Sequence, residues 1–175
     1  MRRAPLWLVV LLVALVAPSA SAQPATPDTA ARAAPVELRI DAIGVLARCE
    51  RVDIEQGMMQ PPTNLAIAGW YGDLDRLGGP GNVVLTGYYY WAGLPALLYE
   101  LALLQEGDEV TITGDDGHDY EYRVESVTTY EKSDAPISAI LKRDECEALT
   151  IITDAGNIDT SGGFTRSTVV RAERM

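Results

Sequence analysis

The chain has 175 residues, of which 47% are hydrophobic, and its 25 acidic residues outnumber 14 basic ones to give a net charge of −11. This length is enough for one domain with a substantial buried core. So acidic a surface repels phosphate backbones and anionic lipid headgroups. We therefore expect neither nucleic-acid binding nor attraction to anionic membranes.

The amino terminus has the three parts of a secretory signal peptide. Arg2 and Arg3 precede an apolar run over residues 6–17, and small residues follow at 20–22. Such a run covers only about 18 Å of helix, well short of the roughly 30 Å core of a bilayer. We predict a signal peptide over residues 1–22 whose cleavage leaves no membrane span and an extracytoplasmic protein, secreted or held at the cell envelope. An uncleaved amino-terminal anchor is the alternative.

Residues 23–35, with the sequence QPATPDTAARAAP, have neither periodicity nor large apolar side chains. This composition predicts a flexible Pro/Ala-rich tether. A single domain is then expected over residues 36–175, because the chain shows no internal repeat and no second boundary.

Short apolar runs separated by turn residues follow the tether, which is typical of an all-β domain. Gly114 to Gly117 form a turn signal between two of these runs and predict a hairpin. Only residues 94–104 have helical spacing, and residues 154–164 are predicted to be a polar loop. The pattern favours a closed, strand-dominated barrel with one or two short helices. Strands are predicted over residues 36–40, 43–52, 82–87, 109–113, 118–131, 148–153 and 165–174.

Three stretches, taken in this order, resemble the sortase family, most closely its classes E and F. They are IDAIGVLARC over residues 40–49, the long stretch over residues 69–113, and LTIITD (149–154) with TRSTVVRAER (165–174). The resemblance covers residues 36–174. It implies an eight-stranded β-barrel. In active members it also implies transpeptidation, in which a cysteine attacks a sorting-signal peptide and an amine resolves the thioester.

The resemblance also implies three site positions, two of which are substituted here. The family's histidine follows a glycine at a strand end, where this chain has Tyr88 after Gly87. The family's cysteine ends a Thr-Leu-x-Thr-Cys motif, where this chain has Asp154, and the family's arginine matches Arg166. The pattern therefore predicts that no catalytic residue is active.

The two substitutions remove the expected chemistry. A carboxylate attacking an amide would have to form a high-energy mixed anhydride, and a tyrosine, which titrates near pH 10, is a poor proton shuttle at neutral pH. Asp154 and Arg166 are instead predicted to form an ion pair that closes the site. Asp154 as the general base of another hydrolysis, and Arg166 as a carboxylate-binding residue, stay open.

The aromatic run after Gly87 has two interpretations. Tyr88 to Trp91 are predicted to pack at the rim of the barrel, which aromatic residues at a strand end commonly do. The alternative is the lip of a peptide groove formed by Tyr89, Tyr90, Trp91 and Thr153.

The two cysteines and the single histidine have structural interpretations as well. Cys49 and Cys146 are a disulfide candidate in an exported protein, with free thiols equally compatible. Cys146 lies eight positions before Asp154, over roughly 20 Å along a strand, which argues against a displaced nucleophile. His118 is predicted to be a solvated turn residue. The acidic clusters lack EF-hand spacing, so no metal or cofactor is expected.

Two functions from different classes remain. The first is an exported, degenerate pseudosortase that serves as a peptide-binding or scaffold module at the cell envelope, its partner a peptide or a segment of a cell-surface protein. The second is an active sortase-type transpeptidase or hydrolase with a non-standard nucleophile. The missing cysteine and histidine favour the first.

Overall fold

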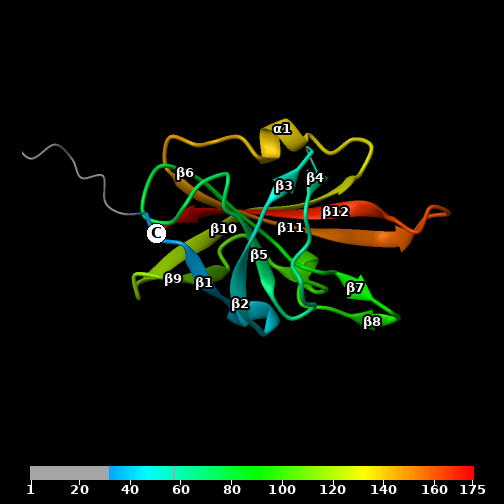
Figure 1. Cartoon of the computed structure of the whole chain (residues 1–175), viewed down its shortest axis with the longest axis horizontal. Coiled ribbons are helices and arrows are strands. Elements are labelled where there is room, and N and C mark those ends of the chain that lie inside the picture. Colours follow the sequence, from blue (N-terminus) through cyan, green and yellow to red (C-terminus); the bar gives the residue numbers. More distant parts are fainter. Residues whose placement is uncertain (1–31, 57) are drawn as a thin grey trace, which may run out of the picture.

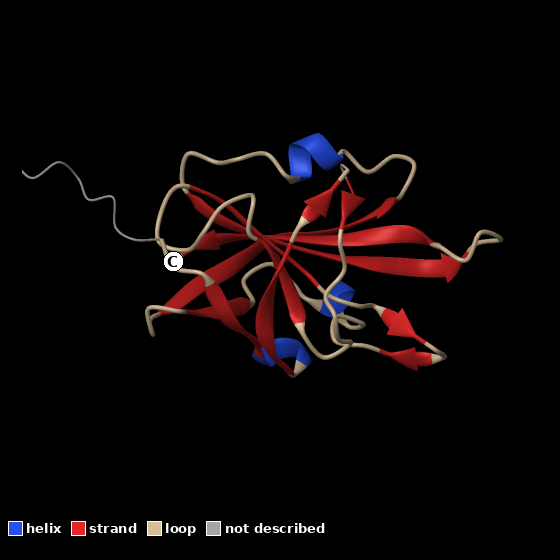
Figure 2. Cartoon of the chain, in the orientation of Figure 1, coloured by secondary structure: helices blue, strands red, loops and turns tan. Residues whose placement is uncertain are grey.

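The described part of the computed structural model comprises residues 32–56 and 58–175 and is built mainly of strands (Figures 1 and 2). The predicted signal peptide and residues 23–31 of the predicted tether lie outside it. The eight barrel strands are β1 (Pro35–Ile40), β2 (Val45–Val52), β5 (Ala68–Tyr71), β6 (Gly81–Thr86), β9 (Glu109–Gly114), β10 (Asp119–Glu131), β11 (Glu147–Ile158) and β12 (Phe164–Arg174). The shorter elements are η1 (Asp41–Ile43), β3 (Ile54–Glu55), β4 (Met58–Met59), β7 (Tyr90–Trp91), β8 (Leu94–Pro95), η2 (Leu101–Leu103) and α1 (Ile137–Ile140).

These eight strands close into a barrel in the order β1-β2-β5-β6-β11-β12-β10-β9. Most neighbours are antiparallel, but β2 pairs with β5 and β6 pairs with β11 in parallel. Val83, Val84 and Leu85 of β6 are all fully buried, as expected of a parallel strand that is covered on both faces. This confirms the predicted closed, mainly β barrel.

The barrel interior is filled by alternate residues of each strand. Leu38 and Ile40, Val110 and Ile112, Leu149 and Ile151 are fully buried pairs with the period of two that strands require. A smaller apolar cluster lies on the outer face, where Val52, Tyr71 and Val84 are covered by Ile54, Met59, Leu74, Leu141 and Ile152. The outer cluster therefore holds the β3–β4 segment and the loop after α1 against the barrel, close to the ends of β6 and β11.

The predicted hairpin is confirmed, since β9 and β10 pair in antiparallel fashion around the turn at residues 114–117. The polar loop predicted over residues 154–164 is wrong at both ends. The strand β11 runs on to Ile158 and β12 begins at Phe164, with a bulge between Ala155 and Ile158. This ribbon extends beyond the barrel (Figure 1), so polar residues on both of its faces are tolerated.

The helix predicted over residues 94–104 is also wrong. Residues 94–95 form β8, and only Leu101–Leu103 are helical, in a 3₁₀ turn. Leu98, Leu101 and Leu104 are the side chains that enter the core. Their spacing of three residues matches the three residues per turn of a 3₁₀ conformation. The apolar pattern of the sequence does not distinguish this spacing from the 3.6-residue period of an α-helix.

The domain begins earlier than the predicted boundary at residue 36. Ala33 is 2% exposed, and its backbone N–H and C=O both bond to Leu77. Arg32 also pairs with Asp75 at 3.3 Å. Residues 32–35, which were predicted to belong to the tether, therefore pack on the barrel.

Candidate functional site

The parallel pairing of β6 with β11 brings two distant parts of the sequence to one end of the barrel. Thr86 pairs with Ile152, and the Thr86 hydroxyl donates a hydrogen bond to the Ile152 carbonyl at 3.0 Å. One residue further along each strand, the buried Thr153 hydroxyl donates to the Gly87 carbonyl at 2.8 Å. Tyr88 and Asp154 each follow these residues, so the register places them side by side.

Tyr88 and Asp154 line a cavity of about 360 Å³, called here the site cavity. Strands β6, β11 and β12 form its floor, and the segment after β4 forms its outer wall. Its lining residues are Met59, Pro61, Pro62, Tyr71, Thr86, Gly87, Tyr88, Lys132, Ile152, Thr153, Asp154 and Ser167. Two of the three site positions predicted from the sequence therefore meet in one cavity, together with Thr153.

The charged pair in the site cavity is formed by Asp154 and Lys132. The Lys132 Nζ lies 2.7 Å from the Asp154 Oδ1, and both side chains are nearly half exposed. Lys132 comes directly after the last residue of β10, and its backbone N–H is bonded to the carbonyl of Thr165 in β12. The Lys132 ammonium group therefore pairs with the Asp154 carboxylate, which would otherwise face a ligand in the site cavity.

The predicted Asp154–Arg166 ion pair is wrong. In the antiparallel β11–β12 register, Asp154 lies opposite Ser167, whereas Arg166 lies opposite Ala155. Adjacent residues of a strand point to opposite faces, so Arg166 projects away from Asp154. It pairs instead with Glu131 at 2.9 Å, and it is not among the residues that line the site cavity.

Tyr71 fixes the outer wall of the site cavity. Its hydroxyl donates a hydrogen bond to the Gln60 carbonyl at 3.0 Å, directly before Pro61 and Pro62. Burial raises the pKa of Tyr71 to about 12, with the nearby Asp154 carboxylate acting in the same direction. The phenol is therefore protonated at neutral pH, and it serves as a donor rather than as a base.

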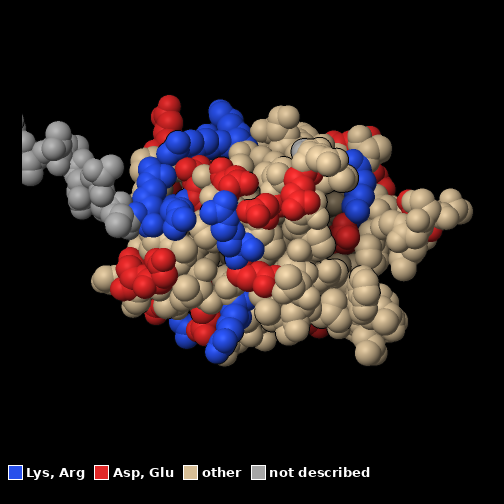
Figure 3. All heavy atoms as spheres, in the orientation of Figure 1, with Lys and Arg blue, Asp and Glu red and all other residues tan. Residues whose placement is uncertain are grey.

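The aromatic run after Gly87 packs on itself and on the β11–β12 ribbon. The rings of Tyr88 and Trp91 pack edge to face, with their centroids 5.7 Å apart. The Tyr89 ring stacks on Tyr99 and packs edge to face on Phe164, at centroid distances of 5.0 and 5.4 Å. None of these rings belongs to the barrel core. Tyr89, Tyr90 and Trp91 do not line the site cavity but lie beside it, with Trp91 56% exposed. This end of the molecule carries few charges in the view of Figure 3.

The candidate disulfide is not formed, and the alternative of free thiols holds for both Cys49 and Cys146. Cys49 lies in β2, which is separated from β11 by β5 and β6 in the barrel order. Three inter-strand steps span about 14 Å, whereas a disulfide requires Cα atoms within roughly 7 Å. Cys146 is exposed just before β11, at the end of that strand opposite Asp154.

His118 and the acidic groups lie outside the site cavity as well. His118 is 79% exposed in the turn between β9 and β10 and pairs with Asp116 at 3.3 Å, which agrees with the predicted solvated turn residue. Over the described residues, no group of three or more His, Cys, Asp or Glu side chains could hold a metal ion. In the same residues, no helix has both the length and the apolar character needed to cross a bilayer.

A sequence model of the sortase domain matches residues 38–175, which is most of the chain. The chain belongs to the sortase family. This agrees with the resemblance inferred from the three sequence stretches. A search of curated proteins finds no match.

Solved sortase structures share the fold at low sequence identity. Sortase A of Listeria monocytogenes has a TM-score of 0.60 and 21% identity, over 81% of this chain and 88% of that one. A lid mutant of sortase A from Corynebacterium diphtheriae has a TM-score of 0.62 and 21% identity, over 85% of this chain and 74% of that one. Sortase C-1 of Actinomyces oris has a TM-score of 0.64 and 20% identity, over 81% of this chain and 72% of that one. At this identity the similarity extends to the fold of the sortase domain alone.

Several residues of this sortase site were missed from the sequence. Lys132 and Ser167 reach the site cavity only through the β10–β12 and β11–β12 registers, which no local pattern reveals. The apolar run at Met58–Met59 and the following Pro61 and Pro62 were a usable signal, because prolines beside apolar residues favour an ordered extended segment. Tyr71 lies in β5, a four-residue strand that is buried throughout and too short to show a period.

Proposed function

We propose that this protein is an exported, catalytically degenerate sortase, closest to classes E and F, that holds a peptide at the cell envelope without cleaving it. The supporting observation is the content of the site cavity, which has neither a thiol nor an imidazole among its lining residues. In the aligned motifs, Tyr88 stands where the family has histidine and Asp154 where it has cysteine.

The ion pair of Asp154 with Lys132 adds to this proposal. Peptide transfer by a sortase needs a group that carries the acyl chain, and a carboxylate held by an ammonium group is a poor acyl acceptor. The thiols of Cys49 and Cys146 and the imidazole of His118 lie elsewhere among the described residues. A ligand in the site cavity is thus bound by shape and polar contacts rather than processed.

A labelled sorting-signal peptide tests the proposal. We expect saturable binding in a fluorescence polarisation titration, and no cleavage product by mass spectrometry after prolonged incubation with an amine acceptor. Treatment with a thiol alkylating reagent should leave the binding unchanged. Turnover that is abolished by Asp154→Ala or by Cys146→Ser would instead establish an active enzyme with a non-standard nucleophile.

Restoring the family's residues tests the inheritance of the site. The double variant Tyr88→His with Asp154→Cys should gain measurable, alkylation-sensitive cleavage of the peptide, because Tyr88 follows β6 and Asp154 lies in the neighbouring strand β11, and both line one cavity. The single variant Tyr88→His is the matched control and should remain inactive. A folded double variant that binds the peptide and never cleaves it would contradict the assignment of these positions.

A further inference from the structure

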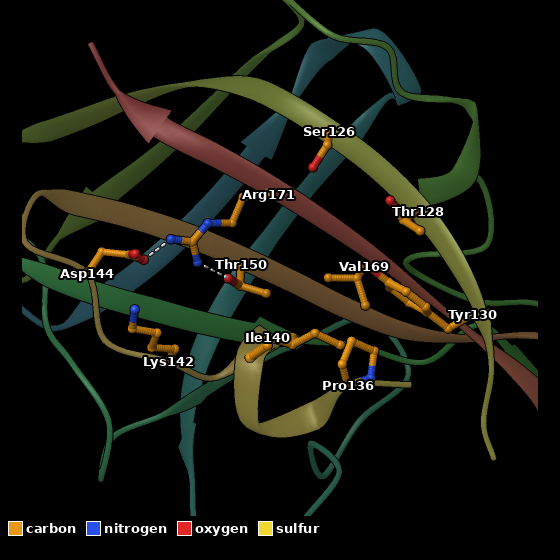
Figure 4. Close-up of a pocket in the computed structure, with 11 residues that line it drawn as sticks. Ser126, Thr128, Tyr130, Pro136, Ile140, Lys142, Asp144, Thr150, Val169 and Arg171 are labelled. Atoms are coloured by element: carbon orange, nitrogen blue, oxygen red, sulfur yellow. Dashed lines mark hydrogen bonds and ion pairs between the residues drawn. The ribbon is translucent and has the colours of Figure 1, made fainter. Parts of the chain in front are cut away.

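A second cavity, of about 290 Å³, lies on the outer face of the barrel between β10, β12 and the loop that carries α1 (Figure 4). This cavity is called here the α1 cavity. Ser126, Thr128 and Tyr130, at alternate positions of β10, line one side of it with hydroxyl-bearing side chains. Apolar side chains of the α1 loop and Val169 of β12 complete the lining. The α1 cavity therefore combines hydroxyl donors with an apolar lining.

Arg171 lies at one end of the α1 cavity and is held in place by a network of polar groups. Its guanidinium donates to the Thr150 hydroxyl at 2.8 Å and forms an ion pair with Asp144 (Figure 4). The Thr150 hydroxyl in turn donates to the Asn82 side-chain carbonyl at 2.8 Å. The Asn82 amide donates to the carbonyls of Ile140 and Lys142 at 3.0 and 3.2 Å. The guanidinium is thus fixed before any ligand arrives, which lowers the entropic cost of binding.

The charges that line the α1 cavity favour an anionic group. Two of them are basic, Lys142 and Arg171, and one is acidic, Asp144. Lys142 is exposed and makes no ion pair with the other described residues, although its side chain points toward the same space as the guanidinium (Figure 4). The chain as a whole has a net charge of −11, whereas the charged residues that line the α1 cavity sum to +1.

Two further carboxylates, Glu125 and Glu173, lie near Arg171 but line the adjoining cavity rather than the α1 cavity. The pKa of Glu125 is raised, first by burial and then by its hydrogen bond with Glu173. The planar guanidinium group of Arg171 is better suited to bidentate hydrogen bonding with a carboxylate than an ammonium group is. A carboxylate is therefore the ligand group that fits the α1 cavity.

The α1 cavity and the site cavity lie along one row of outward-facing residues. In the β11–β12 register this row consists of Asp154 with Ser167, then Ile152 with Val169, then Thr150 with Arg171. The first pair and Ile152 line the site cavity, whereas Val169 and the last pair line the α1 cavity. From Asp154 to Thr150 the strand advances by about 13 Å, or four residues of an extended chain.

We propose that the α1 cavity binds a carboxylate of the peptide held in the site cavity, with Arg171 and Lys142 as its partners. The inference rests on the proposed peptide-binding function and adds a preference to it. The carboxylate belongs to a residue about four positions from the one seated beside Asp154. An acidic side chain and a free carboxyl terminus supply the same chemistry at this place.

A substitution scan of the peptide tests this inference with the full-length protein. The labelled sorting-signal peptide is extended by two residues at each end and blocked at both termini, and Glu replaces each position in turn, with Gln as the matched control. One position should show affinity about tenfold higher for Glu than for Gln. A third series, with Gln and an unblocked carboxyl terminus at that position, separates the two sources of the carboxylate.

Variants assign the preference to the α1 cavity. Arg171→Gln and Lys142→Gln should each reduce the ratio of Glu to Gln affinity at least severalfold, and the exposed Lys142 allows this without disturbing the network of Asn82. The charge-matched control Arg39→Gln, on the exposed face of β1, should leave the ratio unchanged.

Equal affinity for Glu and Gln peptides at every position would overturn the carboxylate inference and leave the peptide-binding proposal in place. A preference for Glu over Gln that persists in both Arg171→Gln and Lys142→Gln would also overturn the carboxylate inference and leave the peptide-binding proposal in place. Absence of binding for every peptide would overturn both.

Discussion

At the scale of single residues, the strand registers decide which charged side chains meet. Asp154 and Arg166 stand twelve positions apart in a hairpin, yet the register gives them different partners, Lys132 and Glu131. Each of the two ion pairs links β10 or its end to the β11–β12 hairpin. Both pairs are about half exposed, and solvent weakens such pairs considerably.

Arg166→Ala should therefore lower the free energy of unfolding by less than about 1 kcal/mol, because the pair with Glu131 is exposed to solvent. Urea denaturation of the variant and the unmodified protein measures the difference, with Glu131→Gln as the companion that breaks the same pair from the other side. A loss of several kcal/mol would show that Arg166 is engaged in a buried interaction.

The two thiols should differ sharply in reactivity. Burial, with the Glu37 carboxylate as a smaller cause, raises the pKa of Cys49 to about 12, whereas the Cys146 side chain is exposed. Since the thiolate is the reactive form, iodoacetamide at pH 8 should alkylate Cys146 and spare Cys49 in the folded protein. Mass spectrometry should find one modification in native conditions and two in denaturant. A folded protein that takes up no label would point to a disulfide.

At the scale of elements, one carboxylate organises the turn that leads into β6. Asp75 is 8% exposed, and it accepts hydrogen bonds from the Asn82 N–H and from the Arg32 side chain. Arg143 of the loop after α1 also pairs with it, at 3.3 Å. This carboxylate thus joins the first described residues, the β5–β6 turn and the α1 loop, and Asn82 extends the network to the α1 cavity.

Gly81→Ala should destabilise the domain by about 2–4 kcal/mol, because it disturbs this carboxylate. The residue has a φ of +140°, and a Cβ atom there would lie 2.3 Å from the Asp75 Cγ. Thermal unfolding measures the effect. Gly163→Ala is the control, since its Cβ would meet only ordinary contacts at 3.8 Å or more. A variant as stable as the control would show that the β5–β6 turn adjusts freely.

At the scale of the whole molecule, the described amino-terminal residues close the barrel end opposite the site. Ala33 pairs with Leu77 through two backbone hydrogen bonds, and Arg32 reaches Asp75. These contacts tie the beginning of the domain to the β5–β6 turn. The barrel end that carries them is also rich in charged residues, in contrast to the aromatic end (Figure 3).

A shortened chain that begins at Val36 should be less stable than one that begins at Arg32, by about 1–3 kcal/mol, because it loses the backbone hydrogen bonds of Ala33 with Leu77, those of Ala34 with Asp115, and the buried Ala33 methyl. Denaturant unfolding of the two forms measures the difference. Equal stability would restore the predicted domain boundary at residue 36.

Local patterns in the sequence are enough to predict the strand-rich barrel and the hairpin between β9 and β10, and short motifs that resemble the sortase family supply the positions of Tyr88 and Asp154. These features are local, because alternation, turn residues and short motifs are written in consecutive positions. The partners of Asp154 and Arg166, the free thiols, and the row of residues shared by the site cavity and the α1 cavity follow only from the tertiary structure. Each of these depends on strand order and register, in which a shift of one residue turns a side chain to the other face.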